Sequence, residues 1–126
     1  MPRPVHFEIH ASDPERAITF YTTVFGWAFE QWADQPYWLV RTGEGVGIDG
    51  GLVPRRGPEP GPDTPMAAFP VTIDVADVDA TINAIENAGG TMAVPKGAIP
   101  AVGWLAYGTD TEGNVFGLMQ PDPGAR

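Results

Sequence analysis

Apolar and polar residues alternate in two short segments of the chain, 5–10 and 70–75. In the first segment Val5, Phe7 and Ile9 would point to one side, and the polar residues between them to the other. Alternation with a period of two is typical of a β-strand that is buried on one face. We therefore expect each segment to form a strand with one face in the core.

Apolar residues at helical spacing follow each predicted strand. In the first helix Asp13 is a suitable N-cap, and Pro14 suits the first position, where the backbone N–H has no helical partner. Asp77 is the expected N-cap of the second helix. Gly26 ends the first helix and Gly89 follows the second. Each helix has a single apolar stripe, so both are expected to pack on sheet.

The two halves of the chain are related by an internal repeat. Residues 5–27 match residues 69–90 at a shift of 64, as between Ile9 and Ile73. Further on, the Trp-Leu and Gly-Leu pairs that begin at Trp38 and Gly51 recur at a shift of 66. The change in shift indicates a two-residue difference in a turn after the first helix. The repeat predicts two tandem copies of one β-α-β-β-β unit.

A proline-rich segment, PRRGPEPGPDTP, separates the two copies at residues 54–65. Neither a helix nor a central strand tolerates this composition, so we expect a linker. The predicted organisation is a first module at 1–53 and a second at 66–126. Together the modules would form one domain.

Composition narrows the classes of function. The chain has 126 residues and a formal net charge of −9, and its seven Lys and Arg are scattered, which argues against nucleic acid as a partner. The only adjacent pair, Arg55-Arg56, is expected to solubilise a loop. No apolar run approaches the ~20 residues that span a bilayer, and no signal peptide is recognisable. The chain contains no cysteine, which excludes disulfides and fits a cytoplasmic protein.

Three segments together resemble the vicinal oxygen chelate superfamily of glyoxalases, bleomycin-resistance proteins and extradiol dioxygenases. They are DPER at 13–16, VFGW at 24–27 and DTEGNVFGL at 110–118. The resemblance implies an α+β fold in which two tandem β-α-β-β-β modules form a curved, cup-like mixed sheet with the helices outside. It also implies a homodimer, because short chains of this superfamily often complete the cup with strands of a partner.

In metal-dependent members the ligands come from one position on the first strand and one on the last strand of each module. The repeat places these positions at His6, Gly51, Pro70 and Gly117. Only His6 has a side-chain donor atom, whereas such a site needs several imidazole or carboxylate ligands. His10 lies about 13 Å along the strand from His6, too far to share its ion. We therefore expect no metal and no cofactor; a divalent ion at His6 is the alternative.

The glycines of the last strands would open space inside the cup. Either a ligand or large side chains, with the equivalent Trp38 and Trp104 as candidates, would fill that space. These tryptophans are either plain core or stacking walls for a planar ligand. The expected lining of the cup is His6, Glu8, Trp38, Gly51, Thr72, Trp104, Gly117 and Met119.

Glu8 is the main catalytic candidate. A carboxylate in a partly apolar cup could act as a general base, and His6 on the same strand face could orient it. The alternative for Glu8 is a salt bridge at the rim, with Arg41 as the candidate partner. The alternative for His6 is a neutral imidazole bonded to a neighbour.

The leading interpretation is a glyoxalase/bleomycin-resistance-like protein that binds a small, partly aromatic or carbonyl-bearing molecule in the cup. It would be a binding protein or a metal-independent enzyme. One alternative is a metal-dependent lyase, isomerase or dioxygenase of the glyoxalase type. Another is a non-catalytic interaction module with a filled cup. Kinship at the level of the fold does not transfer an activity.

Overall fold

The computed structural model of the chain describes residues 4–61, 63 and 70–126. Within these residues the order of elements is β-α-β-β-β followed by a second β-α-β-β-β. The elements are β1 (Phe7–Ala11), α1 (Pro14–Phe25), β2 (Ala28–Gln31), β3 (Trp38–Arg41), β4 (Gly50–Pro54), β5 (Thr72–Asp74), α2 (Val78–Asn87), β6 (Thr91–Ile99), β7 (Gly103–Thr109) and β8 (Val115–Pro121).

The two halves form two four-stranded mixed sheets of identical topology. Their strand orders are β1-β4-β3-β2 and β5-β8-β7-β6, with β1 parallel to β4, β5 parallel to β8 and the other pairs antiparallel. The predicted α+β fold with a repeated unit is confirmed. Of the predicted linker at 54–65, residues 62, 64 and 65 lie outside the described residues, and its boundaries stay a prediction.

Local capping signals set the helix ends where the sequence predicts them. The carboxylate of Asp13 accepts a hydrogen bond from the Arg16 N–H at 3.2 Å, and that of Asp77 accepts one from the Ala80 N–H at 3.1 Å. Gly26 has a φ of +72° and donates its N–H to the Thr22 carbonyl, which ends α1.

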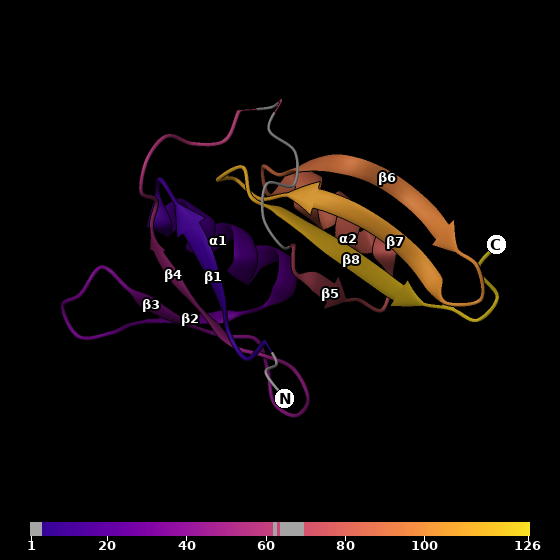
Figure 1. Cartoon of the computed structure of the whole chain (residues 1–126), viewed down its shortest axis with the longest axis horizontal. Coiled ribbons are helices and arrows are strands. Elements are labelled where there is room, and N and C mark those ends of the chain that lie inside the picture. Colours follow the sequence, from indigo (N-terminus) through magenta and orange to yellow (C-terminus); the bar gives the residue numbers. More distant parts are fainter. Residues whose placement is uncertain (1–3, 62, 64–69) are drawn as a thin grey trace.

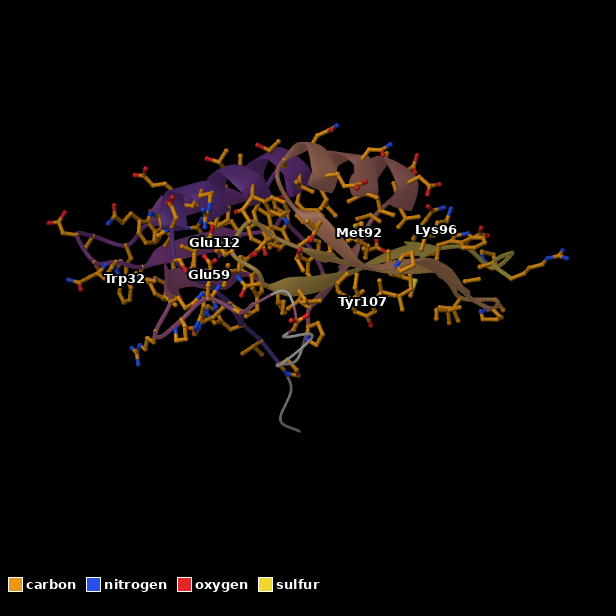
Figure 2. The ribbon with its side chains drawn as sticks, turned by 90° about the horizontal axis from the view of Figure 1, so that it is seen from above. Trp32, Glu59, Met92, Lys96, Tyr107 and Glu112 are labelled. Carbon is orange, nitrogen blue, oxygen red and sulfur yellow. The ribbon has the colours of Figure 1, made fainter. Side chains whose placement is uncertain are left out.

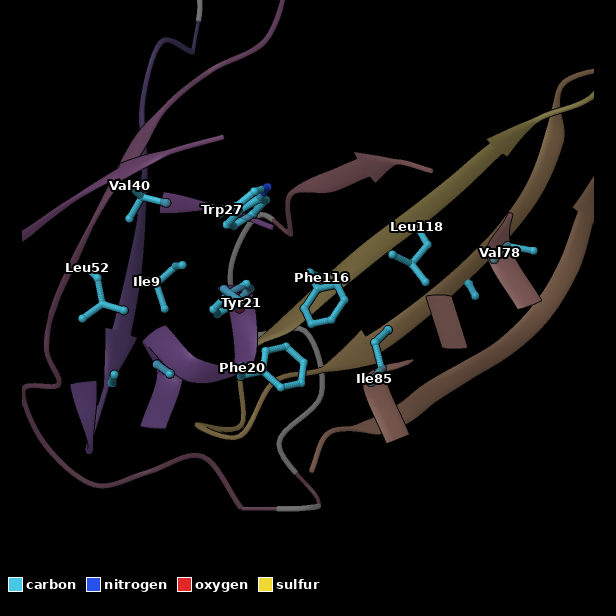
Figure 3. Packing of buried hydrophobic residues seen from close by; sticks show 13 residues of the cluster. Ile9, Phe20, Tyr21, Trp27, Val40, Leu52, Val78, Ile85, Phe116 and Leu118 are labelled. Carbon is cyan, nitrogen blue, oxygen red and sulfur yellow. The ribbon is translucent and has the colours of Figure 1, made fainter. Parts of the chain in front are cut away.

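One aromatic core joins the two modules. Phe20 and Tyr21 of α1 pack against Phe116 of β8, with ring centroids 6.2 and 6.1 Å apart (Figure 3). Tyr21 also stacks on Trp27 at 5.2 Å. Since these rings come from both repeats, neither module buries its apolar residues alone.

Both helices lie on the same side of the molecule, and the strands lie on the other (Figure 2). The two sheets stand side by side and do not close on one another (Figure 1). The single chain therefore leaves the expected cup open. No helix among the described residues is long and apolar enough to cross a bilayer.

The turn between β7 and β8 fastens the second module to the first through Asp110. This carboxylate is buried and accepts hydrogen bonds from the Tyr21 hydroxyl at 2.7 Å and from the backbone N–H groups of Glu112 and Asn114, both at 2.8 Å. Burial raises the pKa of Asp110, although these bonds partly oppose the shift. Burial, and then the nearby Asp110 charge, raises the pKa of the Tyr21 hydroxyl well above its ordinary value.

Glu112 in the same turn holds the start of α1. Its side chain is fully buried and accepts from the Asp13 N–H at 2.8 Å and from Arg16 Nε at 2.5 Å. Burial alone would raise the pKa of Glu112, but the hydrogen bonds from Arg16 and Asp13 outweigh it and lower the pKa. The carboxylate therefore stays charged inside the junction.

Arg55 completes this junction, which corrects its expected role as a solubilising loop residue. Its Nη2 donates to the carbonyl oxygens of His10 at 2.7 Å and Glu112 at 2.6 Å. The two carbonyls belong to different modules. Arg55 thus ties the end of β1 to the β7–β8 turn.

Candidate ligand-binding face

The face of the sheets away from the helices is the candidate site, and strand register defines its members. Residues paired directly across strands point to the same side of a sheet. Glu8 pairs with Gly51 and Thr72 with Gly117, whereas their neighbour Leu52 is buried in the core. We call this side the cup face. It carries Glu8, His10, Leu39, Arg41 and Gly51 in the first sheet, and Thr72, Asp74, Leu105, Tyr107, Gly117 and Met119 in the second.

The repeat inferred from the sequence gives matching positions in space. The cross-strand pair Glu8–Gly51 of the first sheet corresponds to Thr72–Gly117 of the second, at sequence shifts of 64 for the first residue and 66 for the glycine. Met119 pairs with Asp74, two residues beyond Gly117 on the same face. The structure thus brings together His6, Glu8 and Gly51 on the first sheet and, separately, Thr72, Gly117 and Met119 on the second.

The two tryptophans lie on the opposite side from the glycines. Trp38 pairs with the buried Leu52, and Trp104 pairs with Gln120, whose side chain reaches the first N–H of α2. Both rings pack against the hydrophobic core. Trp104 also donates its Nε1–H to Asp122 at 3.0 Å. The expectation that the tryptophans fill the space at the glycines is therefore wrong.

Tyrosine side chains occupy that space instead. A Cβ at Gly51 would collide with the hydroxyl group and ring of Tyr37. A Cβ at Gly117 would lie 3.0 Å from Thr72 Oγ1 and 3.2 Å from the ring of Tyr107. Tyr37 is a site residue that the sequence did not predict. No sequence signal pointed to it, because the strand register that puts Leu39, and with it Tyr37, on the cup face is visible only in the structure.

Tyr37 links the first strand to an exposed tryptophan. Its hydroxyl oxygen lies 3.3 Å from His6 Nε2 in a hydrogen bond. The Tyr37 ring also makes an edge-on contact with Trp32, with centroids 6.0 Å apart and planes at 73°. Trp32 donates its backbone N–H to the Tyr37 carbonyl, so the two residues continue the β2–β3 pairing and share a face. Trp32 is 62% exposed.

Glu8 is an exposed carboxylate with a histidine partner. Glu8 Oε1 lies 3.2 Å from His10 Nε2, and the two side chains are 47% and 44% exposed. Arg41 pairs with Glu30 at 3.3 Å, so the expected rim salt bridge between Arg41 and Glu8 is wrong. His6 bonds to Tyr37 and not to Glu8. The expected Glu8–His6 pair is therefore replaced by two separate pairs.

The residues present do not fit a metal site of the kind used by metal-dependent relatives. Among the described residues, no three His, Asp or Glu side chains converge on one point that an ion could occupy. At the two glycine positions the cup face presents tyrosine rings and a threonine hydroxyl, which are not the imidazole and carboxylate groups that such ions prefer.

The second sheet presents a more apolar surface than the first. Leu105, Tyr107 and Met119 are half-buried on its cup face. Val94, which pairs with Tyr107, and Ile99 at the end of β6 are each 38% exposed. The first sheet instead carries imidazole, carboxylate and phenol groups. The two cup faces therefore offer different chemistry to a ligand.

Comparison with known proteins gives a family match over most of the chain. Residues 3–118 match the family described as the Glyoxalase/Bleomycin resistance protein/Dioxygenase superfamily. Over 124 residues the chain is 32% identical to "Putative glyoxylase CFP32" from Mycobacterium bovis and Mycobacterium tuberculosis. The match covers 93% of this chain and 45% of each relative, so the chain spans less than half the length of these proteins.

Two solved structures illustrate the similarity of the fold. TnmS3, an antibiotic binding protein from Streptomyces sp. CB03234, is 27% identical with a TM-score of 0.67, covering 97% of this chain and 98% of its own. The fosfomycin resistance protein FosX from Listeria monocytogenes is 15% identical with a TM-score of 0.73, covering 97% and 93%. At 15% identity the second likeness concerns the fold alone.

Proposed function

Because the chain belongs to the glyoxalase/bleomycin resistance protein/dioxygenase superfamily, we propose that it binds a small organic molecule on its cup face without a catalytic metal ion. The observation that carries the proposal is the pair of glycines, Gly51 and Gly117, at equivalent points of the two sheets. These positions carry no donor atom, and Tyr37 and Tyr107 adjoin them. The face therefore suits hydrogen bonding and aromatic contact better than chelation.

The lining supports a ligand that is partly aromatic and carries a carbonyl or similar oxygen. Small-molecule sites are mostly apolar with a few well-placed polar groups. Here the second sheet supplies the apolar part, with Leu105 and Met119, and the first supplies His6 and Tyr37. The likeness to TnmS3, which binds an antibiotic, supports a binding role as well.

We also propose that the protein is a homodimer that encloses the ligand between cup faces. Buried pockets cover 70–90% of a ligand surface, and one chain with an open cup would cover much less. Val94 and Ile99 offer exposed apolar contacts for a second copy. Sedimentation velocity at several concentrations tests this, and Val94→Lys should shift a dimer toward monomer. A monomer at all concentrations, with or without ligand, contradicts the dimer.

For any reaction on this face we propose Glu8 as the base. Its partner His10, at 3.2 Å, takes the orienting role that the sequence suggested for His6. Glu8→Gln should abolish turnover of an identified substrate while leaving the fold intact, because the side chain is about half exposed. Unchanged turnover in this variant would remove Glu8 from the proposal. The lack of cysteine supports a cytoplasmic location, which imaging of the tagged protein would test.

Two measurements on the purified protein test the proposed function together. A thermal-shift screen against aromatic and dicarbonyl metabolites should find a stabilising ligand, because a ligand at 100 times its Kd adds about 2.7 kcal/mol of stability. Elemental analysis after purification without chelator should find metal far below one ion per chain. Near-stoichiometric nickel, zinc, manganese or iron would instead favour a metal-dependent lyase, isomerase or dioxygenase. No shift across the library and no metal would favour an interaction module.

A further inference from the structure

We infer that His6 and Tyr37 form the polar anchor of the bound ligand, a fixed hydrogen-bonding site for a carbonyl, carboxylate or phenol oxygen whose attached ring packs on Trp32. The inference rests on the proposed function, since it names the part of the cup face that recognises the ligand. It assigns to the cup face a hydrogen-bonding site beside Gly51.

Gly51 is what allows Tyr37 to take this position. A Cβ at residue 51 would overlap the Tyr37 hydroxyl, and the next two nearest atoms are also in the Tyr37 ring. Residue 51 lies between its cross-strand partners, Glu8 on β1 and Leu39 on β3. The hydroxyl group of Tyr37 is thus held over the middle of the first sheet, beside the imidazole of His6.

Counting protons shows that the pair keeps one donor for a ligand. A neutral imidazole carries one N–H and the phenol carries one O–H. Their mutual hydrogen bond at 3.3 Å uses one of these, whichever group donates. The other remains available to an acceptor oxygen on the ligand. When His6 Nε2–H donates, the free donor is the Tyr37 O–H beside Gly51; when Tyr37 donates, the free donor is His6 Nδ1–H on the other side of the imidazole ring. The anchor is the first arrangement, in which the Tyr37 O–H is free for the ligand.

Trp32 provides the adjoining aromatic surface. Three backbone hydrogen bonds fix its hairpin, namely Trp32 N–H to the Tyr37 carbonyl at 2.9 Å, Gln35 N–H to the Trp32 carbonyl at 3.1 Å and Tyr37 N–H to the Gln35 carbonyl at 2.8 Å. Trp32 is 62% exposed, although its ring makes an edge-on contact with that of Tyr37. It lies on the side of the strands away from the helices, as does Tyr107 (Figure 2). An exposed indole on a hairpin with a fixed backbone is a suitable partner for a planar ring.

The second sheet lacks an equivalent anchor. At Gly117 the neighbouring atom of Tyr107 is a ring carbon and not the hydroxyl group, and the position equivalent to His6 is Pro70. Proline has no side-chain hydrogen-bonding group. In the described part of the chain, the Tyr107 hydroxyl shares no hydrogen bond with another side chain. The same deletion of a hydroxyl group on the two sheets therefore provides a matched comparison.

The test measures whether binding depends on a ligand oxygen and on Tyr37. The probes are 2-acetylnaphthalene and its oxygen-free analogue 2-ethylnaphthalene, titrated into ¹⁵N-labelled protein. The indole N–H signal of Trp32, assigned with a Trp32→Phe variant, reports binding. Wild-type protein should bind the ketone about fivefold more tightly, because one neutral hydrogen bond is worth about 1 kcal/mol. Tyr37→Phe should lose this preference, and Tyr107→Phe should keep it.

Each outcome decides the anchor separately from the proposed function. Equal affinities for the two probes in wild-type protein, or a preference that survives in Tyr37→Phe, would overturn the anchor. If a ligand from the thermal-shift screen binds but the ketone does not, the anchor is wrong and the proposed function stands. Melting temperatures of both Tyr→Phe variants should match wild type, which excludes unfolding as the cause of a lost preference.

Discussion

Replacing Glu112 by glutamine should destabilise the whole domain, although the side chain lies in a turn. The carboxylate is fully buried and joins two modules, because it accepts from the Asp13 N–H at the start of α1 and from Arg16 one turn later. It also accepts from the Thr111 hydroxyl at 3.2 Å. No other side chain of the β7–β8 turn contacts α1 through two separate oxygens in this way.

The size of the effect follows from the geometry. The carbonyl oxygen of glutamine can keep one of the two bonds, and the amide NH2 group then faces a donor instead of an acceptor. Losing one buried hydrogen bond to a charged group costs about 1.5–3 kcal/mol. The cost stays below the ~3–5 kcal/mol of a fully buried broken pair, because Arg16 is 48% exposed and can turn to water. We expect a loss of about 2–3 kcal/mol in the free energy of unfolding.

Urea unfolding followed by tryptophan fluorescence measures this loss, at one protein concentration so that any dimer contributes equally. The control is Glu86→Gln, which removes the same charge from an exposed position on α2. Such a surface change is expected to stay within about 0.5 kcal/mol. For a domain of this size, the Glu112→Gln variant should also melt roughly 6–15 °C lower.

A free energy of unfolding for Glu112→Gln that equals that of Glu86→Gln would refute the reasoning. It would mean that the junction between the modules is held by the aromatic core alone. A changed urea dependence without a changed midpoint would point to the unfolded state instead.

Two further predictions concern acid stability and the cup face. The lowered pKa of Glu112 stabilises the fold above the ordinary glutamate pKa, and this contribution is lost as the pH falls through the folded value. The melting temperature should therefore fall more steeply between about pH 6 and pH 3 for wild type than for Glu112→Gln. An equal fall in the two proteins would contradict this. Asp110 has the opposite effect. Its pKa is raised in the folded state, so the charged carboxylate destabilises the fold, and protonation as the pH falls increases the free energy of unfolding. Gly51→Ala should lower the free energy of unfolding by about 1–3 kcal/mol, because the added methyl group forces Tyr37 aside. In a Tyr37→Ala background the same substitution should cost far less. An equal cost in both backgrounds, measured by urea unfolding, would show that the two residues do not compete for space.

The sequence by itself determined the repeated unit and the ends of its helices. Asp13 and Asp77 cap their helices through bonds to residues three positions later, and such contacts depend only on local sequence. The shared β-α-β-β-β order follows from the repeat, because two similar sequences with similar patterns bury the same faces. The missing donor atoms at Gly51 and Gly117 could also be read directly from the chain.

Only the tertiary structure decided which side chains meet on the cup face. A shift of one residue in strand register moves every side chain to the other face, and no local pattern specified the register of β3 against β4. That register sends Trp38 to the core and Tyr37 to the cup face. It also places the Tyr37 hydroxyl beside His6, which is 31 positions away in the sequence. Folding likewise brings Glu112 into contact with Arg16, which is 96 positions away. Contacts of this kind arise from packing of distant segments, which local patterns do not encode.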